Sequence, residues 1–315
     1  GLKLSLRKIL FSVFKRNLTK EIKVAQLSGY VSEHSGYHHG EASLNGAIVN
    51  MAQDFVGSNN INLLMPNGQF GTRLQGGKDS ASERYIFTRL NNVTRNIFKK
   101  EDDDILNYLN DDGLSVEPIF YVPIIPMILV NGALGIGTGF STKIPCYNPL
   151  QILNVIKQKI RDSPQGMDYV EEVIPYYKNF DGSIEYTENN KYSTKGRYTI
   201  KHQTVTVSEL PIGVWNEDYI CFLEKCLETK KNKLKDYKDL STDKKIHIEL
   251  IFHNDVDFHL YSTINMLEKN FKLQSTVSIS NMYLFNSNEK LVHYKSVNDI
   301  INDFVITRLE YYEIR

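Results

Sequence analysis

Tyr85 is the residue in this chain whose type and setting best suit covalent chemistry, and it directly follows Arg84 in the segment SERYIFT. A tyrosine phenol can attack a phosphorus atom, and a neighbouring guanidinium can hold the phosphate and its developing charge. Just upstream, residues 69–79 (QFGTRLQGGKD) are rich in glycine and carry Arg73 and Lys78. Glycine lets a backbone approach a nucleic-acid strand closely, and the cations suit phosphates. The pair is therefore a candidate for phosphoryl transfer, with an ordinary surface strand as the structural alternative.

Two adjacent histidines, His38 and His39, lie in the segment YHHGE at the start of a predicted helix. Adjacent side chains rarely converge on one ion and no fourth ligand is nearby, so a zinc site is disfavoured and we assign no metal ligands. They are then either polar residues that satisfy a helix N-terminus or anion-binding residues at its positive end.

A second glycine-rich segment, GALGIGTG at residues 132–139, carries Ile136. Its spacing is not the G-x-G-x-x-G of dinucleotide-binding folds, and Pro145 follows soon after. The segment therefore argues against a nicotinamide-dependent oxidoreductase, which remains the weaker alternative function.

Helical periodicity predicts the elements that position these residues in the first part of the chain. Residues 2–14 form an amphipathic helix with an apolar stripe and a cationic side, and residues 22–33 form a second helix. After a break at Ser35-Gly36, a third helix is predicted from Glu41 to Phe55. Helix, short glycine turn and helix is the helix-turn-helix pattern, and the Asn- and Gly-rich segment up to Phe87 suits a wing made of a hairpin and loops.

Beyond about residue 116 the pattern becomes α/β. The apolar, proline-punctuated residues 121–130 are predicted as a strand region, and the acidic run 101–104 as a solvated loop or helix start rather than a metal cage. Helices are predicted at 149–160, 216–228, 256–269 and 297–313, strands within 196–210, 246–252 and 277–285, and a charged exposed loop at 230–245.

The charge is unevenly distributed although the 315-residue chain has a formal net charge of zero. Residues 1–100 hold 14 Lys and Arg against 6 Asp and Glu, whereas residues 101–119 hold seven acids and no Lys or Arg. A neutral total can therefore hide one basic face, which is what phosphates feel. No run approaches the ~18 apolar residues of a membrane span. Three cysteines indicate reduced thiols in an intracellular protein.

Several segments in order resemble the DNA-breakage region of type IIA DNA topoisomerases, with the eukaryotic and viral topoisomerase II branch closer than bacterial gyrase. They include residues 23–44, 55–64, 68–88, 122–145 and 271–285. The resemblance implies that Tyr85 cuts DNA and becomes linked to the 5′ phosphate, with Arg84 and His39 near the scissile phosphate. It also implies that Ile136 is a wedge inserted between base pairs, and that the segment at 216–313 belongs to the unit called the tower.

The resemblance further implies cofactors and partners. The complete enzyme would use Mg²⁺, held by acids of a separate domain whose motifs are absent here, and ATP; we expect this chain to bind neither. Its partners would be double-stranded DNA and a second copy of the chain, without a membrane. We expect a nuclear location, or a cytoplasmic viral factory if the source is viral.

We therefore predict an α+β multidomain chain excised from a longer polypeptide. Its expected units are a basic amphipathic helix (1–19), a winged-helix domain with the catalytic tyrosine (20–115), a tower domain (116–300) and the start of a helix leading to a coiled-coil gate (301–315). The predicted DNA contacts are Lys3, Arg7, Lys8, His38, Arg73, Lys78 and Ile136. The main rival function is a winged-helix module that bends DNA without chemistry.

Overall fold

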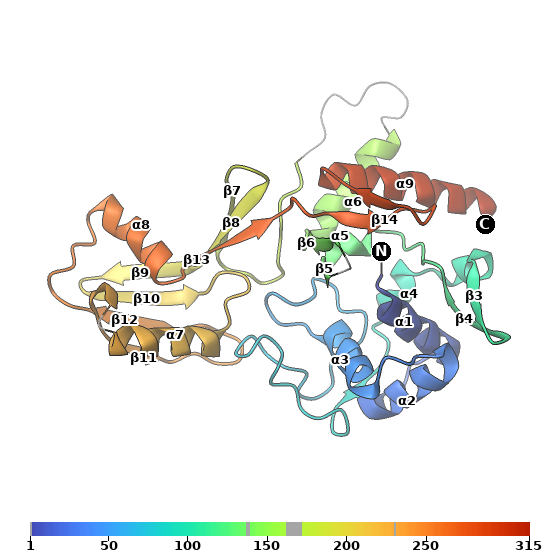
Figure 1. The fold of residues 1–315 in the computed structure, drawn as a ribbon, viewed down its shortest axis with the longest axis horizontal. Helices are drawn as coiled ribbons and strands as arrows, with labels where there is room; N and C mark the ends of the chain where they lie inside the picture. The colour runs from blue at the N-terminus through green and yellow to red at the C-terminus, as the bar shows by residue number, and fades with distance from the viewer. Residues whose placement is uncertain (1, 137–138, 162–171, 230) are drawn as a thin grey trace.

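The polypeptide folds into two lobes. The computed structural model describes residues 2–136, 139–161, 172–229 and 231–315. Figure 1 shows a larger, mostly helical body at the right, which contains both ends of the chain, and a smaller sheet-based body at the left. We call residues 2–161 and 279–315 the main lobe, and residues 183–278 the sheet lobe. Helices and strands are both abundant, so the α+β class is confirmed.

The three predicted N-terminal helices are confirmed as α1 (Leu4–Arg16), α2 (Val24–Ser35) and α3 (Glu41–Ala52). Each buries an apolar face at helical spacing, such as Leu44 and Ile48 of α3. Helix α2 ends at Gly36, whose φ of 60° is a left-handed conformation that glycine adopts without strain. Helix α3 ends three residues before the predicted Phe55, because Gln53 leaves the helical conformation.

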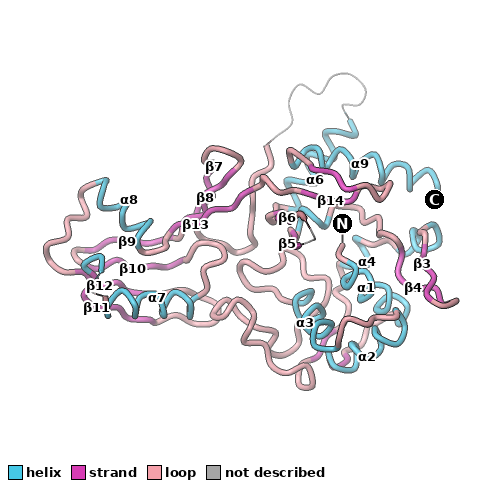
Figure 2. Tube along the Cα trace, viewed as in Figure 1, coloured by secondary structure: helices cyan, strands magenta, loops and turns pink. Residues whose placement is uncertain are grey.

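The predicted hairpin after α3 is wrong. Figure 2 shows the chain between α3 and α4 (Thr94–Ile97) mostly as loop. Residues 22–23 (β1) instead pair antiparallel with residues 87–88 (β2). One physical reason is that the side-chain amide of Gln53 donates to the carbonyl oxygens of Phe70 (2.8 Å) and Gly77 (3.3 Å), acceptors that a strand ladder would otherwise use.

The rest of the main lobe differs from expectation at two places. Residues 127–130, predicted within a strand region, form the short helix α5 (Met127–Val130). The acidic run lies in a 3-10 helix (Lys100–Ile105), where Asp102 is buried rather than solvated, because it pairs with Arg308 (2.8 Å) and Arg315 (3.2 Å). The remaining elements are β3 (Tyr108–Asp111), β4 (Leu114–Pro118), β5 (Ala133–Ile136), β6 (Ser141–Ile144), α6 (Pro149–Arg161), β14 (Tyr283–Phe285), β15 (Leu291–His293) and α9 (Val297–Ile314).

The sheet lobe contains a four-stranded antiparallel sheet in the order β11-β12-β10-β9 and a three-stranded sheet in the order β13-β8-β7. Alternating residues of the central strands point inward, and Val205 of β10 faces Leu250 of β12 in register. The predicted loop 230–245 is partly wrong, because residues 234–239 form strand β11 with Leu234 buried. The elements are β7 (Ser183–Tyr186), β8 (Lys191–Lys195), β9 (Arg197–Lys201), β10 (Thr204–Glu209), α7 (Asn216–Glu228), a 3-10 turn (Lys231–Lys233), β11 (Leu234–Asp239), β12 (Ile248–Phe252), α8 (Tyr261–Asn270) and β13 (Gln274–Ser278).

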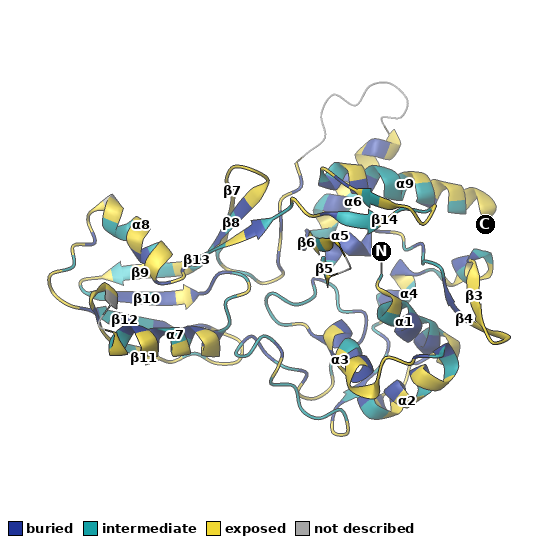
Figure 3. Cartoon of the chain, viewed as in Figure 1, coloured by how far each residue is buried: buried dark blue, intermediate teal, exposed yellow. Residues whose placement is uncertain are grey.

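Each lobe has its own hydrophobic core, visible as the dark blue parts of the cartoon in Figure 3. The main-lobe core joins Ile9 and Leu64 to Leu129, Val155 and Ile301. The expected division between residues 115 and 116 therefore falls inside one core. In the described ranges, no helix has the length and apolar character needed to cross a membrane.

Candidate nucleic-acid interface

Tyr85 ends a turn that holds its side chain in solvent. Its backbone N–H donates to the carbonyl of Ser82 (2.9 Å), and its side chain is 74% exposed. The start of α2 anchors both sides of this turn: Val24 N–H donates to the Ile86 carbonyl (3.0 Å), and Ala25 N–H donates to the Glu83 carbonyl (3.1 Å). Ile86 is buried, so the chain alternates from a core residue to an exposed phenol. The neighbouring guanidinium of Arg84 is also exposed.

The predicted histidines lie just before α3 and are both exposed. The rings of His38 and His39 have centroids 4.4 Å apart, and Tyr37 meets His39 edge-on at 5.6 Å. His38 Nδ1 lies 3.2 Å from the carbonyl oxygen of Gly36. For the described residues, the structure records no hydrogen bond between His39 and Arg84, so these contacts alone do not bring the two together.

A cleft of about 590 Å³ separates the first turns of α3 from the loop that leads to Tyr85. The side from α3 is lined by Glu41, Ala42, Asn45, Gly46, Val49 and Asn50, and the loop side by Gly77, Ser80, Ala81 and Glu83. The structure therefore places the helix that follows His39 and the turn that carries Tyr85 on two walls of one cleft, although 46 positions separate these two residues in the sequence.

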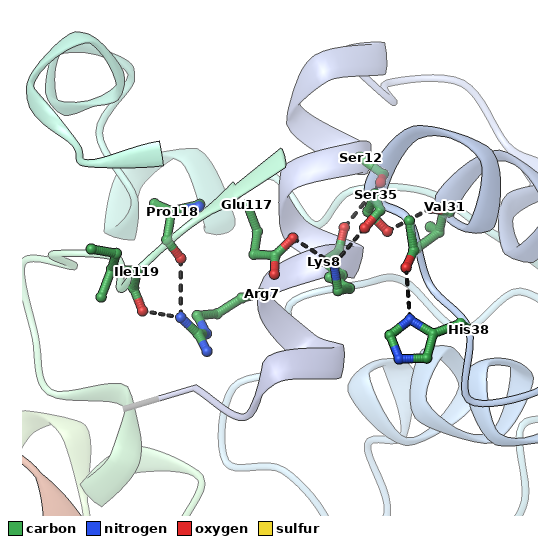
Figure 4. Close-up of polar contacts among 10 residues, drawn as sticks. Arg7, Lys8, Ser12, Val31, Ser35, His38, Glu117, Pro118 and Ile119 are labelled. Atoms are coloured by element: carbon green, nitrogen blue, oxygen red, sulfur yellow. Dashed lines mark hydrogen bonds and ion pairs between the residues drawn. The ribbon is translucent and has the colours of Figure 1, made fainter. Parts of the chain in front are cut away.

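Two predicted phosphate contacts on α1 are turned into the protein, as Figure 4 shows. The Lys8 ammonium lies 2.8 Å from the Glu117 carboxylate and also donates to the Ser35 carbonyl, and both charged side chains are buried. The half-buried Arg7 donates to the carbonyls of residues 118 and 119, and burial lowers its pKa. Lys8 is thus neutralised inside the main lobe, so its predicted exposure to a phosphate does not hold here.

The two cations of the loop at residues 69–79 have opposite fates. Arg73 is buried in a two-pronged ion pair with Glu209 of the sheet lobe, where their side chains are 8% and 3% exposed. It therefore does not face solvent, contrary to the prediction. Lys78 is exposed. Sequence reasoning missed Glu209, and no local signal could have found it, because the partners lie 136 positions apart.

The predicted wedge residue lies on a short hairpin formed by β5 and β6. Ile136 ends β5 opposite Ser141 and is 90% exposed. The exposed ammonium of Lys3 donates to the Leu134 carbonyl on the same strand, which ties the start of α1 to this hairpin. Gly137 and Thr138, which complete the loop, lie outside the described residues.

Comparisons with known proteins agree on one family. The model of the DNA gyrase/topoisomerase IV family, built on the chain that carries the DNA-cleavage region in those enzymes, matches residues 1–315. The chain is 47% identical to DNA topoisomerase 2 of Arabidopsis thaliana over 330 residues and 44% identical to DNA topoisomerase 2-beta of Mus musculus over 323 residues. All of the chain is covered in both cases, but only 21% and 19% of those relatives.

A solved structure is similarly close. It is the DNA-binding, cleavage and re-ligation domain of Plasmodium falciparum topoisomerase II, with a TM-score of 0.92, 46% identity, and coverage of 99% of this chain and 42% of that one. Sequence and fold thus point the same way: the chain belongs to the DNA gyrase/topoisomerase IV family, the type IIA DNA topoisomerases.

Proposed function

We propose that this chain is the DNA-binding and cleavage segment of a type IIA DNA topoisomerase in which Tyr85 attacks a phosphodiester of duplex DNA. The exposure of Tyr85 carries the proposal. Of the large apolar and aromatic side chains that the structure describes, only Ile136 is more exposed. Leaving so much ring surface in water forfeits hydrophobic stabilisation, so a turn anchored at both sides that presents this phenol supports a role outside the fold.

The proposed step exchanges one phosphodiester for another. A bond forms between the Tyr85 phenol oxygen and phosphorus, the bond from phosphorus to the 3′ oxygen breaks, and the 3′ oxygen receives a proton as the phenol loses one. The chain keeps the 5′ phosphate, and the reverse attack by the 3′ hydroxyl reseals the strand. Arg84 lies next to the nucleophile, where its guanidinium can stabilise charge on the phosphoryl oxygens, and His39 borders the same region.

The architecture we propose is a winged-helix domain over residues 20–115 followed by a tower over residues 116–300. The packing of α2 against α3 across the turn at Gly36 supports the helix-turn-helix part. Two copies of the chain would each cut one strand of the duplex. The eukaryotic relatives favour a nuclear location, with a cytoplasmic viral factory as the alternative.

The metal ion and the nucleotide belong elsewhere in this proposal. Across the ranges that the structure describes, no three His, Cys, Asp or Glu side chains gather closely enough to hold an ion. These residues do not fit a Mg²⁺ site, so we assign Mg²⁺ and ATP to other parts of the complete protein.

The DNA contacts that we retain are the exposed ones: Lys3, His38, Lys78, Arg84 and Ile136. Phosphate contacts require a charge that water and counterions can reach, because affinity derives from counterion release. Lys8 and Arg73 have protein carboxylates as partners and are assigned structural roles, while Arg7 is held by main-chain carbonyls.

The test is covalent capture of DNA by the complete protein. Tyr85→Phe removes the attacking oxygen and should abolish protein–DNA adducts while leaving duplex binding intact. Tyr186→Phe is the matched control, because Tyr186 is also exposed but lies in the sheet lobe. Adducts that persist in Tyr85→Phe, located by mass analysis on another residue, would overturn the assignment, and a parent protein that binds and bends DNA without forming adducts would support the non-catalytic module instead.

A further inference from the structure

The loop before Tyr85 is fastened to the sheet lobe at the first turn of α7. The N–H groups of Asn216 and Glu217 donate to the carbonyls of Arg73 (3.5 Å) and Leu74 (3.0 Å). The Gln75 side-chain amide donates to the Glu217 carboxylate (2.8 Å). Free N–H groups at the start of a helix need acceptors, and here the loop supplies two of them.

Trp215 fills the space between this loop and the turn after α3. A Cβ atom added at Gly76 would collide with the indole Nε1, and one added at Gly57 would lie 3.1 Å from Cη2. The Phe55 ring meets the indole edge-on with centroids 5.8 Å apart. The contact at Gly76 leaves no room for a side chain, so the backbone of the loop lies directly against Trp215.

The buried pair of Arg73 and Glu209 is the second part of this junction. Glu209 also accepts from the backbone N–H groups of Asp181 (3.3 Å) and Leu210 (2.9 Å), so its carboxylate is held in one place by the sheet lobe. Neither member of the pair belongs to either hydrophobic core, and Trp215 is likewise outside both. The junction is therefore a separate set of contacts and not an extension of a core.

The segment between the junction and Tyr85 is closed by its own hydrogen bonds. Thr72 donates to Asp79 through its N–H (2.8 Å) and its hydroxyl (2.5 Å), and Ala81 N–H donates to the Gln69 carbonyl (2.8 Å). The turn that ends at Tyr85 begins one residue after Ala81. A loop cross-linked in this way transmits a shift at residues 73–76 to the residues on either side of it.

We infer that Glu209 and Trp215 are positioning residues for the Tyr85 reaction: they fix the loop of residues 69–79 against the sheet lobe, and so set where Lys78 and the Tyr85 turn lie relative to the duplex. The inference rests on the proposed function of Tyr85. Neither residue touches the reacting atoms. Their effect is geometric, and a misplacement of about 1 Å can lower a reaction rate about 10²-fold.

The test compares cleavage with binding in the complete protein. Trp215→Ala should slow single-turnover cleavage about 10- to 100-fold, because the nucleophile is misplaced. The Kd for duplex DNA should stay within about two-fold of the parent, because the exposed cations that supply affinity remain. Trp215→Phe keeps an aromatic ring between Gly57 and Gly76 and should restore most of the rate.

The ion pair has its own variants. Glu209→Gln leaves Arg73 buried without a counter-charge and should slow cleavage, whereas Arg73→Met with Glu209→Met removes both charges and should recover part of the rate. Phe271→Leu is the control, because it weakens the sheet-lobe core, which contains none of the junction residues. It should lower Tm without changing the cleavage rate per folded molecule.

A readout without chemistry uses Trp215 itself, the single tryptophan of this 315-residue chain. Glu209→Gln should open the junction and shift the emission maximum of Trp215 to longer wavelength, and Phe271→Leu should not. An unshifted spectrum in Glu209→Gln would overturn the role of the ion pair.

The outcomes separate this inference from the proposed function. Parental cleavage by Trp215→Ala overturns the inference while leaving Tyr85 as the nucleophile. A loss of cleavage that is matched by a proportional loss of duplex affinity, or reproduced by Phe271→Leu, also overturns it. Adducts persisting in Tyr85→Phe overturn the proposed function instead, whatever the junction variants do.

Discussion

The Lys8 ammonium and the Glu117 carboxylate form an ion pair 2.8 Å apart, with side chains only 8% and 2% exposed. The pair joins α1 to β4 beneath the surface of the main lobe, and the Ser35 carbonyl at the end of α2 completes the contacts of the ammonium. A cation expected on a DNA-binding face therefore holds three elements of the fold together.

Breaking this pair should destabilise the protein. Lys8→Met leaves the Glu117 carboxylate buried without a partner, so we expect a loss of about 3–5 kcal/mol in the free energy of unfolding. Replacing both residues, as Lys8→Met with Glu117→Leu, should recover most of that loss because no lone charge remains. Urea denaturation followed by circular dichroism measures both values. Equal stability of the single variant and the parent would show that the pair does not form in solution.

The salt dependence of DNA binding should distinguish buried from exposed cations. Lys78→Met should lower the slope of log affinity against log salt by about 0.9, because one fewer counterion is released. Arg73→Met, with its partner replaced in the same protein as Glu209→Met, should leave the slope unchanged because that charge is already paired. Fluorescence anisotropy with a labelled duplex at several salt concentrations gives the slopes. A reduced slope in the Arg73 variant would place that guanidinium at the DNA.

Arg84 should act on the rate of the reaction. We expect Arg84→Ala to slow formation of the covalent adduct about 10²–10³-fold, as removal of a donor that stabilises transition-state charge does. Its effect on duplex affinity should be no larger than that of one phosphate contact. Arg197→Ala, which removes an exposed arginine of the sheet lobe that pairs with Asp181, is the control. Quench-flow capture of adducts measures the rate, and a parental rate in Arg84→Ala would assign its guanidinium to binding alone.

Ile136 should affect the shape of the bound DNA. Its 90% exposure at the end of β5 leaves the side chain free to enter a base step, which costs a few kcal/mol of unstacking that the contacts of a bent duplex offset. Ile136→Ala should reduce the bend angle and the cleavage rate, and change affinity for straight DNA much less. Energy transfer between dyes at the duplex ends reports the bend, with Leu114→Ala as an equally apolar exposed control. Full bending by Ile136→Ala would make it an ordinary surface residue.

Thiol reactivity should follow burial. Burial raises the pKa of the Cys146 thiol from 9.0 to about 12, so at pH 9 it stays protonated in the folded chain. Iodoacetamide at this pH should label the exposed Cys221 and spare Cys146 until the protein unfolds. The stabilising contribution of the protonated thiol is fully present below pH 9 and is lost as the pH rises toward 12. Peptide mass analysis after timed labelling decides this, and equal rates at the two positions would contradict the burial.

Periodicity alone located much of the secondary structure. It predicted the three N-terminal helices and helix α7, because an amphipathic pattern of 12 or 13 residues is a local property of the chain. It failed for the wing, where glycine-rich residues are held by side-chain contacts such as those of Gln53. It failed also at β11, whose strand conformation depends on pairing with β12.

The candidate site divides in the same way. The sequence by itself determined which residues could do chemistry: the Arg84–Tyr85 pair, the histidines before α3 and the isoleucine between glycines. Only the tertiary structure decided which charges remain available, because Lys8 and Arg73 meet carboxylates 109 and 136 positions away. A charge is neutralised or left free by what packs around it, and packing between distant segments leaves no trace in the residues next to it.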